Sequence, residues 1–405
     1  MSKLDELLRE LCPNGVEYKK LGDVATITRG GNFQKKDYVE CGVPCIHYGQ
    51  IYVHYGLFVN ETISFISEET AKKQKLAQPG DIIMAVTSEN IDDVCKCIAW
   101  LGSEKVAVSG HSAIIHHNLD PKYLVYYLHS AMFYRQKIKI AHGTKVIEVT
   151  PNKLNDIVLP VPPLEVQSEI VRILDNFTEL TAELTTELTT RKKQYEYYRD
   201  VLFELSDCVE KPICEIAQTN IGLATSVTKH KRESGVPLIH NSDIQQNAIV
   251  LKNVEYISEE FAAKNSKKIL HKGDIITVHT GDVGTSAVID DLFDGSIGFT
   301  TITTRINDVT VVLPQYLCHY LNSHRCKSDI ATMTISDRSN LNQSSFEKLM
   351  IPIPSIAKQQ QIIDILDRFN ILCSDISSGL PAEIEARQKQ YEYYRDKLLS
   401  FKELA

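Results

Sequence analysis

Long apolar segments are absent from this 405-residue sequence. No run approaches the roughly 20 apolar residues that a membrane-spanning helix needs, so we do not expect an integral membrane protein. The first six residues, MSKLDE, contain no apolar core of a secretory signal. Ten cysteines occur at irregular spacings, which is typical of free thiols rather than of a disulfide framework. We therefore predict a cytoplasmic protein.

A surplus of positive charge is also absent. The formal net charge is −8, whereas a free-standing, non-specific nucleic-acid binder is normally basic. The acidity is uneven, since residues 164–205 hold 5 basic and 9 acidic side chains, a net of −4. Residues 17–158 hold 16 against 15 (+1), and residues 210–353 hold 14 against 16 (−2). With 43% hydrophobic and 24% charged residues, the composition is globular, and the length predicts two to four domains.

Motifs for catalysis are missing as well. We find no Gly-rich dinucleotide loop, no Asn/Asp-Pro-Pro-aromatic motif of amino-methyltransferases and no Gly-x4-Gly-Lys-Ser/Thr phosphate loop. Glu17-Tyr18-Lys19 fits only the second half of a nuclease motif and precedes any partner acid. The Gly-rich segment Gly281–Gly284 is interpreted as a hairpin turn. We expect no catalytic residue in this chain.

Four cysteines are a weak candidate for a zinc site. Cys41 and Cys45 are spaced Cys-x3-Cys, and Cys95 and Cys97 are spaced Cys-x-Cys, neither of which is the favoured Cys-x2-Cys. An internal repeat places Val288 and Asp290 where Cys95 and Cys97 stand. We therefore predict buried thiols and no metal. The histidines of the β-like run (His111, His116 and His117) are interpreted as structural.

The internal repeat covers almost the whole chain with a period of about 193 residues. Gly42–His47 returns as Gly235–His240, with five of six residues unchanged. The octapeptide KQYEYYRD occurs twice without change, at Lys193–Asp200 and at Lys389–Asp396. Such a repeat indicates two similar structural units.

A long helix is predicted after each globular unit. Residues 165–205 contain neither Gly nor Pro, and their apolar side chains recur every three or four residues. The second helical region starts near Ala357 and is interrupted at Gly379-Leu380-Pro381. We expect the two stripes to pair as an antiparallel coiled coil; the alternative is that each helix packs only on its own domain. Residues 7–11 resemble the end of each helix, which hints at a closed, pseudo-two-fold arrangement.

The globular units are predicted to be α+β, because short β-rich runs alternate with Gly, Asn and Asp turns. The fold class is thus α+β, with two similar sheet-containing domains separated by long helical regions. The predicted boundaries are 1–16 for an N-terminal helical segment, 17–160 for domain 1, 161–206 for the central helix, 207–354 for domain 2 and 355–405 for the C-terminal helical region.

The chain resembles the specificity subunit of type I DNA restriction-modification systems over essentially its whole length. The resemblance lies in Leu-Pro-Val-Pro-Pro at 159–163, in Gln-Ser-Glu-Ile-Val-Arg-Ile-Leu-Asp at 167–175, in the Thr-x-Glu-Leu repeats and in the motif at 387–396. The tetrapeptide repeats are most similar to the subgroup called IC.

The resemblance implies a phage-defence protein with two target-recognition domains, each reading one half of a split double-stranded DNA sequence. It implies no catalytic residues here. Two methyltransferase subunits would dock on the helices and methylate adenine, and two translocase–nuclease subunits would complete the restriction enzyme. S-adenosylmethionine, ATP and Mg²⁺ would belong to those partners.

Polar and basic loop residues are the candidates for DNA contact, although a solvated loop explains them equally well from sequence alone. The candidates are Arg29, Asn32, Gln34, Lys35, Lys36, His142, Thr144, Lys145, Lys229, Lys231, Arg232, Arg338 and Asn340. The candidates for partner binding on the helices are Ile173, Phe177, Tyr195, Tyr198, Arg199, Ile365, Phe369, Tyr391, Tyr394 and Arg395.

Other functions stay open at this point: a recognition subunit for a fused nuclease–methyltransferase, a coiled-coil protein scaffold, or an orphan enzyme. The repeats also suggest a spacer rule. Four helical residues turn the chain by about 400°, which exceeds one full turn by about 40°. One base pair turns DNA by about 35°. We hypothesise that deleting Thr181–Leu184 shortens the unread DNA spacer by one base pair.

Overall fold

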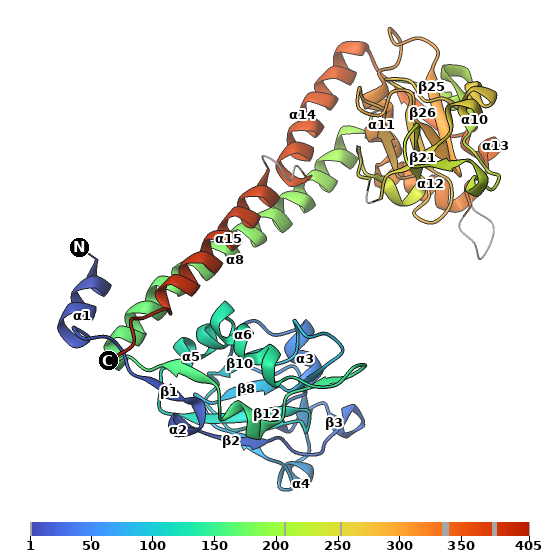
Figure 1. Ribbon diagram of the computed structural model, residues 1–405. Helices are drawn as coiled ribbons and strands as arrows, with labels where there is room; N and C mark the ends of the chain where they lie inside the picture. The colour runs from blue at the N-terminus through green and yellow to red at the C-terminus, as the bar shows by residue number, and fades with distance from the viewer. Residues whose placement is uncertain (1, 206–207, 252, 334–339, 375–378, 405) are drawn as a thin grey trace. The chain divides into compact units, whose positions relative to one another are not determined.

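The structure is a computed structural model that describes residues 2–205, 208–251, 253–333, 340–374 and 379–404. It divides into two compact units (Figure 1). Unit 1 comprises residues 1–183 and 385–405, and unit 2 comprises residues 184–384. Two helices cross the boundaries: α8 (Leu164–Leu202) and α15 (Leu380–Leu398).

Unit 1 is built on two five-stranded sheets. The first has the order β2-β12-β8-β10-β5, and the second has the order β3-β6-β4-β11-β7. The first sheet contains β2 (Ala25–Arg29), β12 (Ser112–His117), β8 (Ile82–Ala85), β10 (Cys97–Trp100) and β5 (Phe58–Val59). The second contains β3 (Tyr38–Val39), β6 (Phe65–Ile66), β4 (Val43–Ile46), β11 (Val106–Val108) and β7 (Leu76–Ala77). Two short pairs complete the unit: β1 (Tyr18–Lys20) with β14 (Val158–Pro160), and β9 (Thr87–Ser88) with β13 (Ile147–Glu148).

Short helices link these strands. They are α1 (Lys3–Leu11), α2 (Leu21–Val24), the 3-10 turn η1 (Lys35–Asp37), α3 (Tyr48–Val53), α4 (Glu68–Ala71), α5 (Pro121–Leu128), α6 (Ala131–Ile140) and α7 (Pro151–Leu154). Helix α5 begins where sequence rules predict, because Pro121 occupies its first turn and the Asp120 carboxylate accepts from the N–H groups of Lys122 and Tyr123.

Unit 2 repeats this framework with four-stranded sheets, in the orders β16-β25-β22-β23 and β17-β21-β18-β24. The first contains β16 (Ala217–Ile221), β25 (Thr301–Ile306), β22 (Ile275–Val278) and β23 (Ser286–Val288). The second contains β17 (Lys231–Arg232), β21 (Glu255–Ile257), β18 (Val236–His240) and β24 (Ile297–Phe299). The short pairs are β15 (Val209–Pro212) with β26 (Met350–Ile353), and β19 (Ile244–Gln245) with β20 (Ala248–Ile249).

The helices of unit 2 follow the same sequence of elements. They are α9 (Ile213–Ile216), η2 (Thr228–His230), η3 (Asn241–Asp243), α10 (Glu259–Lys264), η4 (Ser266–Lys268), α11 (Pro314–Leu321), α12 (His324–Met333), α13 (Gln343–Phe346) and α14 (Ile356–Ser374). The α+β class, with two sheet-containing domains and long helices, is therefore confirmed.

A buried helix joins the sheet domain to the long helix in each unit. In unit 1, the Tyr126 hydroxyl of α5 donates to Asp175 of α8 at 2.7 Å, and Lys122 pairs with the same carboxylate at 2.6 Å. In unit 2, His319 of α11 lies 2.8 Å from Asp367 of α14. Apolar side chains surround both contacts in the main core of each unit. The same joint is thus built twice with different side chains.

Long helices pair within each unit (Figure 1). In unit 1, Phe177 of α8 stacks on Tyr394 of α15 with ring centroids 5.4 Å apart. In unit 2, Phe369 of α14 stacks on Tyr198 of α8 at 5.6 Å. Cys373, one turn later in α14, lies near Lys192, so later residues of α14 oppose earlier residues of α8. The predicted mutual pairing is confirmed, and it is antiparallel in unit 2.

The two ends of the described chain meet in unit 1. Val16 bridges Glu403, and the Tyr18 hydroxyl lies 3.1 Å from the Phe401 carbonyl. Leu4 of α1 shares a core with Leu399. No helix among the described residues is both long and apolar enough to cross a membrane.

Candidate nucleic-acid interface

The basic side chains expected to contact DNA occupy matching places in the two units. Lys35 and Lys36 form the exposed 3-10 turn η1 that precedes edge strand β3. Lys229 lies in the equivalent turn η2, and Lys231 and Arg232 form the edge strand β17 that follows it. Edge strand β3 pairs with β6, which ends at Ile66, and edge strand β17 pairs with β21, which ends at Ile257. Sheet register therefore shows that β3 and β17 are equivalent strands.

Arg29 connects two loops of unit 1 through a hydrogen bond and an ion pair. It ends β2, and its Nε donates to the Gly110 carbonyl at 2.8 Å. Its guanidinium also pairs with Glu148 at 3.1 Å. Glu148 in turn exchanges two backbone hydrogen bonds with His142. The structure therefore brings the loop after β2 and the loop 142–148 together, although more than 100 residues separate them.

A cleft of about 580 Å³ lies beside this joint. Three predicted residues, Arg29, Asn32 and Gln34, line it. Its other side chains include His47, Tyr48 and His111, which sequence reasoning missed as site residues. The three rings form a cluster whose centroids are 4.5 Å (His47–Tyr48) and 5.0 Å (Tyr48–His111) apart. Planar polar rings in a cleft can stack on bases and hydrogen-bond to their edges.

A second cleft of about 470 Å³ shares Tyr48 with the first. It is lined by Tyr52, Ser88, Asn90 and Val146, among others. The predicted residues His142, Thr144 and Lys145 are exposed in the adjoining loop, which β13 and β9 attach to the sheet domain. All eight candidates of unit 1 thus gather around two loops and the clefts between them.

The candidates of unit 2 are less completely described. Lys231 pairs with Glu255 at 2.6 Å, and Arg232 donates to the carbonyl of Lys231 at 2.7 Å. Asn340 is exposed and bridges Thr280, at the place where Glu148 pairs with Thr87 in unit 1. Arg338 lies outside the described residues. DNA contact by these residues stays a prediction.

Several residues predicted to bind partner subunits are instead used within their own unit. Tyr195 and Tyr391 are buried, and burial raises the pKa of Tyr195 to about 12. Arg199 is 5% exposed, lies over the Tyr195 ring and donates to Gln246 at 3.0 Å. Arg395 lies over Tyr391 in the same way. The burial of the two tyrosines and the bond from Arg199 to Gln246 attach the buried face of each octapeptide to its own unit.

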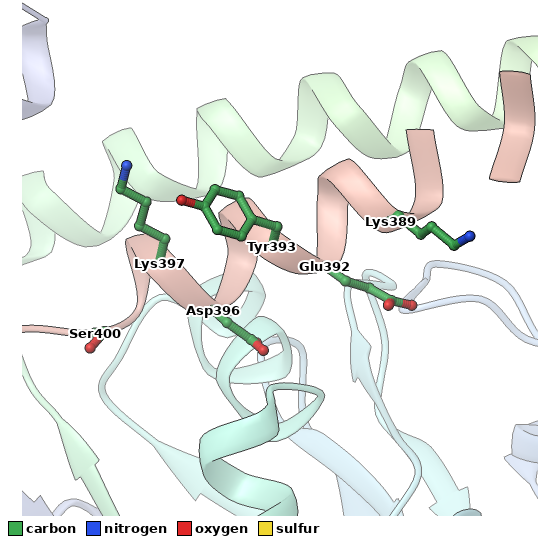
Figure 2. A pocket seen from close by; sticks show the side chains of 6 residues that line it. All are labelled: Lys389, Glu392, Tyr393, Asp396, Lys397 and Ser400. Carbon is green, nitrogen blue, oxygen red and sulfur yellow. The ribbon is translucent and has the colours of Figure 1, made fainter. Parts of the chain in front are cut away.

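The exposed face of the octapeptide differs from the predicted set. Tyr197 is 64% exposed and Tyr393 is 61% exposed; of the neighbours that sequence reasoning selected, Tyr198 is 44% exposed and Tyr394 is half-buried. Ile365 is exposed, while Ile173, Phe177 and Phe369 are half-buried. Figure 2 shows the surface around Tyr393, where Lys389, Glu392, Asp396 and Lys397 project from α15 and Ser400 follows the end of that helix.

The last residue of each octapeptide anchors a helix of the sheet domain. Asp396 accepts from the backbone N–H of Ala131 at the start of α6, at 3.2 Å. Asp200 accepts from the N–H of His324 at the start of α12, at 2.9 Å. A carboxylate at a helix N-terminus satisfies free N–H groups and the helix dipole. The identical sequence therefore makes the identical contact in each unit.

The predicted counterparts of Cys95 and Cys97 were wrong. Sheet register aligns Cys97 with Ser286 and Cys95 with Gly284, not with Asp290 and Val288. The reason is a connection between the paired strands that is four residues shorter in unit 2. Burial raises the pKa of Cys95 to about 12, so its thiol stays protonated at neutral pH. Among the described residues, no group of three metal-binding side chains occurs.

The sequence matches the family described as type I restriction modification DNA specificity domain, over residues 13–191 and 206–386. The chain belongs to this family. It is 38% identical over 255 residues to the EcoR124I/EcoR124II specificity subunit of Escherichia coli, and this alignment spans 60% of the chain and 61% of that protein. It is 32% identical over 321 residues to a type I specificity subunit of Haemophilus influenzae, spanning 75% and 76% of the two chains.

Solved structures of the family have the same fold. The crystal structure of the type I S subunit from M. genitalium aligns with a TM-score of 0.53 at 14% identity, over 95% of this chain and 96% of that one. A chain from a structure of type I complex assembly aligns with a TM-score of 0.63 at 16% identity, over 96% and 98%. These likenesses show the fold that the chain shares with solved proteins of type I systems, and the chain spans 61% of the length of the E. coli specificity subunit that it matches.

Proposed function

We propose that each unit of this specificity subunit reads one half of a bipartite DNA target. The observation that carries the proposal is a duplicated sheet framework whose corresponding loops carry different side chains. Tyr48 follows His47 in the cleft of unit 1, whereas Asn241 follows the equivalent His240 in unit 2. Two different readers on one scaffold suit two different half-sites.

We further propose that two methyltransferase subunits dock on the helices. The exposed face of the octapeptide supports this, because Lys193, Glu196 and Tyr197 present the same surface in unit 2 that Lys389, Glu392 and Tyr393 present in unit 1 (Figure 2). Exposed tyrosines are frequent at the centres of protein interfaces. One copy of the surface per unit fits two copies of one partner.

We infer the remaining partners from the chain's membership of the family. Two translocase–nuclease subunits would complete the restriction complex, and S-adenosylmethionine, ATP and Mg²⁺ would be used by the partner subunits. The net charge of −8 supports a division of labour, in which partner subunits supply much of the charge that neutralises the DNA backbone. We place the complex in the cytoplasm, and the ten irregularly spaced cysteines fit a reducing compartment.

Genome-wide mapping of methylated adenines tests the reading function. The chain is co-expressed with its methyltransferase, and the modified sites are sequenced. We expect one interrupted word, with two specified halves and an unread spacer. A coiled-coil scaffold without DNA contact predicts no sequence preference that depends on this chain, and a single uninterrupted word would contradict the proposal.

Native mass spectrometry tests the docking surface. Tyr197→Ser and Tyr393→Ser are each expected to leave one methyltransferase subunit bound instead of two, and the double variant none. Tyr134→Ser, at a partly exposed tyrosine of α6, is the matched control and should leave two bound. Two bound subunits in the double variant would refute the assignment of this surface.

A further inference from the structure

His47 has a fixed tautomer with one ring nitrogen left over. It lies between β4 and α3 as the N-cap of α3, and its Nδ1 accepts a hydrogen bond from the backbone N–H of Gly49 at 3.2 Å. A nitrogen that accepts carries no proton, so the neutral ring carries its proton on Nε2. Burial, Lys35 and His111 all lower the pKa of His47, which favours this neutral form.

The His47 ring, which carries this Nε2–H group, belongs to the lining of the cleft in unit 1. The ring lines the 580 Å³ cleft together with Asn32 and His111, and it lies beside the Tyr48 ring. Within the described part of the chain, Nδ1 has a hydrogen-bond partner and Nε2 has none. An N–H donor on a half-buried ring that lines a cleft of planar and polar groups can bind an acceptor from outside the protein.

The same position in unit 2 is closed. His240 is the last residue of β18 and the equivalent His47 directly follows β4, but the Nε2 of His240 lies 3.0 Å from Glu255. Glu255 also pairs with Lys231 at 2.6 Å, and these two contacts lower its pKa. Sheet register places Ser64 of unit 1 where unit 2 has Glu255, and Ser64 instead bonds to Gln50. The carboxylate that engages His240 therefore has no counterpart beside His47.

We propose that His47 is a specificity-determining residue of unit 1, whose Nε2–H donates to an acceptor on a base edge, while the equivalent His240 reads no base. The acceptors open to a donor in the major groove are N7 and O6 of guanine, N7 of adenine and O4 of thymine. Tyr48 and His111 position the ring and close the cleft around the base. The inference rests on the proposed reading function and assigns one reading contact within it.

Two substitutions separate reading from structure. His47→Asn keeps an acceptor near the Nδ1 position for Gly49, and Asn is a favoured N-cap, but it removes the distal donor. His47→Gln keeps an N–H donor near the Nε2 position and loses the cap. Each variant is co-expressed with the methyltransferase, and the modified word and the melting temperature of the complex are measured.

The two variants are expected to fail in opposite ways. H47N has the melting temperature of the parent complex. At one position of one half-site, its preference for the correct base over the other bases falls roughly tenfold, which is in the range of a single base contact. H47Q melts lower and keeps the word. His240→Asn, the matched control in unit 2, leaves both halves of the word unchanged.

Other results would overturn the inference. An unchanged word in H47N, or equal relaxation in H47N and H47Q, would show that His47 is only a cap. Relaxation at several positions of both halves would indicate a distorted complex and no specific contact. A parent complex that modifies no bipartite word would instead refute the proposed function, and the inference with it.

Discussion

Shortening α8 by four residues is expected to shorten the unread DNA spacer by one base pair. The helix is continuous from Leu164 to Leu202, so the deletion of Thr181–Leu184 acts on all that follows. It removes about 400° of rotation and about 6 Å of rise. The residual rotation of about 40° is close to the twist of one base pair, about 35°, whereas the rise exceeds the 3.4 Å of one base pair.

The apolar stripe of α8 makes this deletion tolerable. Leu180, Leu184 and Leu188 are half-buried and spaced by four residues. After the deletion, Leu188 follows Leu180 by four positions, so the stripe keeps its register. A deletion of two residues, in contrast, would turn the following helix by about 200° and disrupt it.

The assay is a map of methylated adenines for three variants. The four-residue deletion should yield the parental half-words with a spacer one base pair shorter. Replacing Thr181–Leu184 by four alanines keeps the length and should leave the spacer unchanged. The two-residue deletion should abolish modification. An unchanged spacer in the four-residue deletion would refute the reasoning that helix length sets the spacing.

Three further predictions concern stability and binding. Phe177→Ala and Phe369→Ala should each lower the free energy of unfolding by about 1–3 kcal/mol, because each removes a ring stacked between paired helices. Urea denaturation measures this loss, and a loss below about 0.5 kcal/mol would contradict the prediction. Replacing Lys35 and Lys36 by Ala should reduce the slope of log K for DNA binding against log salt concentration by the equivalent of about two phosphate contacts. Replacing Lys19 and Lys20, which pair with Glu17 and Asp156, should leave this slope unchanged. Equal slopes in the two variants would contradict the placement of DNA. Burial lowers the pKa of His129 to about 4 in the folded chain, below the value of about 6.5 in the unfolded chain. The unfolded chain is therefore protonated at this histidine at higher pH than the folded chain. The free energy of unfolding should fall by about 2–3 kcal/mol as the pH drops from about 6.5 to 4. His129→Asn should flatten that part of the pH profile, and an unaltered profile would contradict the assignment.

The framework of the fold was predictable because the repeat marks matching strands. Gly80-Asp81-Ile82-Ile83 and Gly273-Asp274-Ile275-Ile276 become β8 and β22, whose side chains are all buried. A Gly turn followed by an apolar run is a local signal that needs no distant contact. The counterparts of Cys95 and Cys97 were missed because loop lengths differ between the units, and a constant period cannot follow such a change.

The candidate site was predictable only in part. Arg29, Lys35 and Lys36 stand out as a basic cluster, but His47 and His111 lie 64 residues apart in the sequence. The parallel pairing of β4 with β11 brings them together, and no local pattern encodes that pairing. The repeated motif that ends on His47 and His240 was the available signal. The difference between them depends on Glu255, which only the sheet register places beside His240.

Helix partners depend on contacts of still longer range. Asp396 reaches Ala131 across 265 residues, and the identical octapeptide alone does not say which sheet domain it serves. Apolar periodicity predicted that the helices pair. It did not predict that α8 pairs with α15 in unit 1 and with α14 in unit 2.

The central claim is that each unit recognises one half of the DNA target. Exchanging the sheet domain of unit 1 for that of another family member tests this claim most directly. Residues 17–158 are replaced by the corresponding segment of another family member, and methylated adenines are mapped for the parent and the chimaera with the same methyltransferase. The account predicts that one half of the word changes while the other half and the spacer stay the same. A chimaera in which neither half changes, or in which both change, would contradict it.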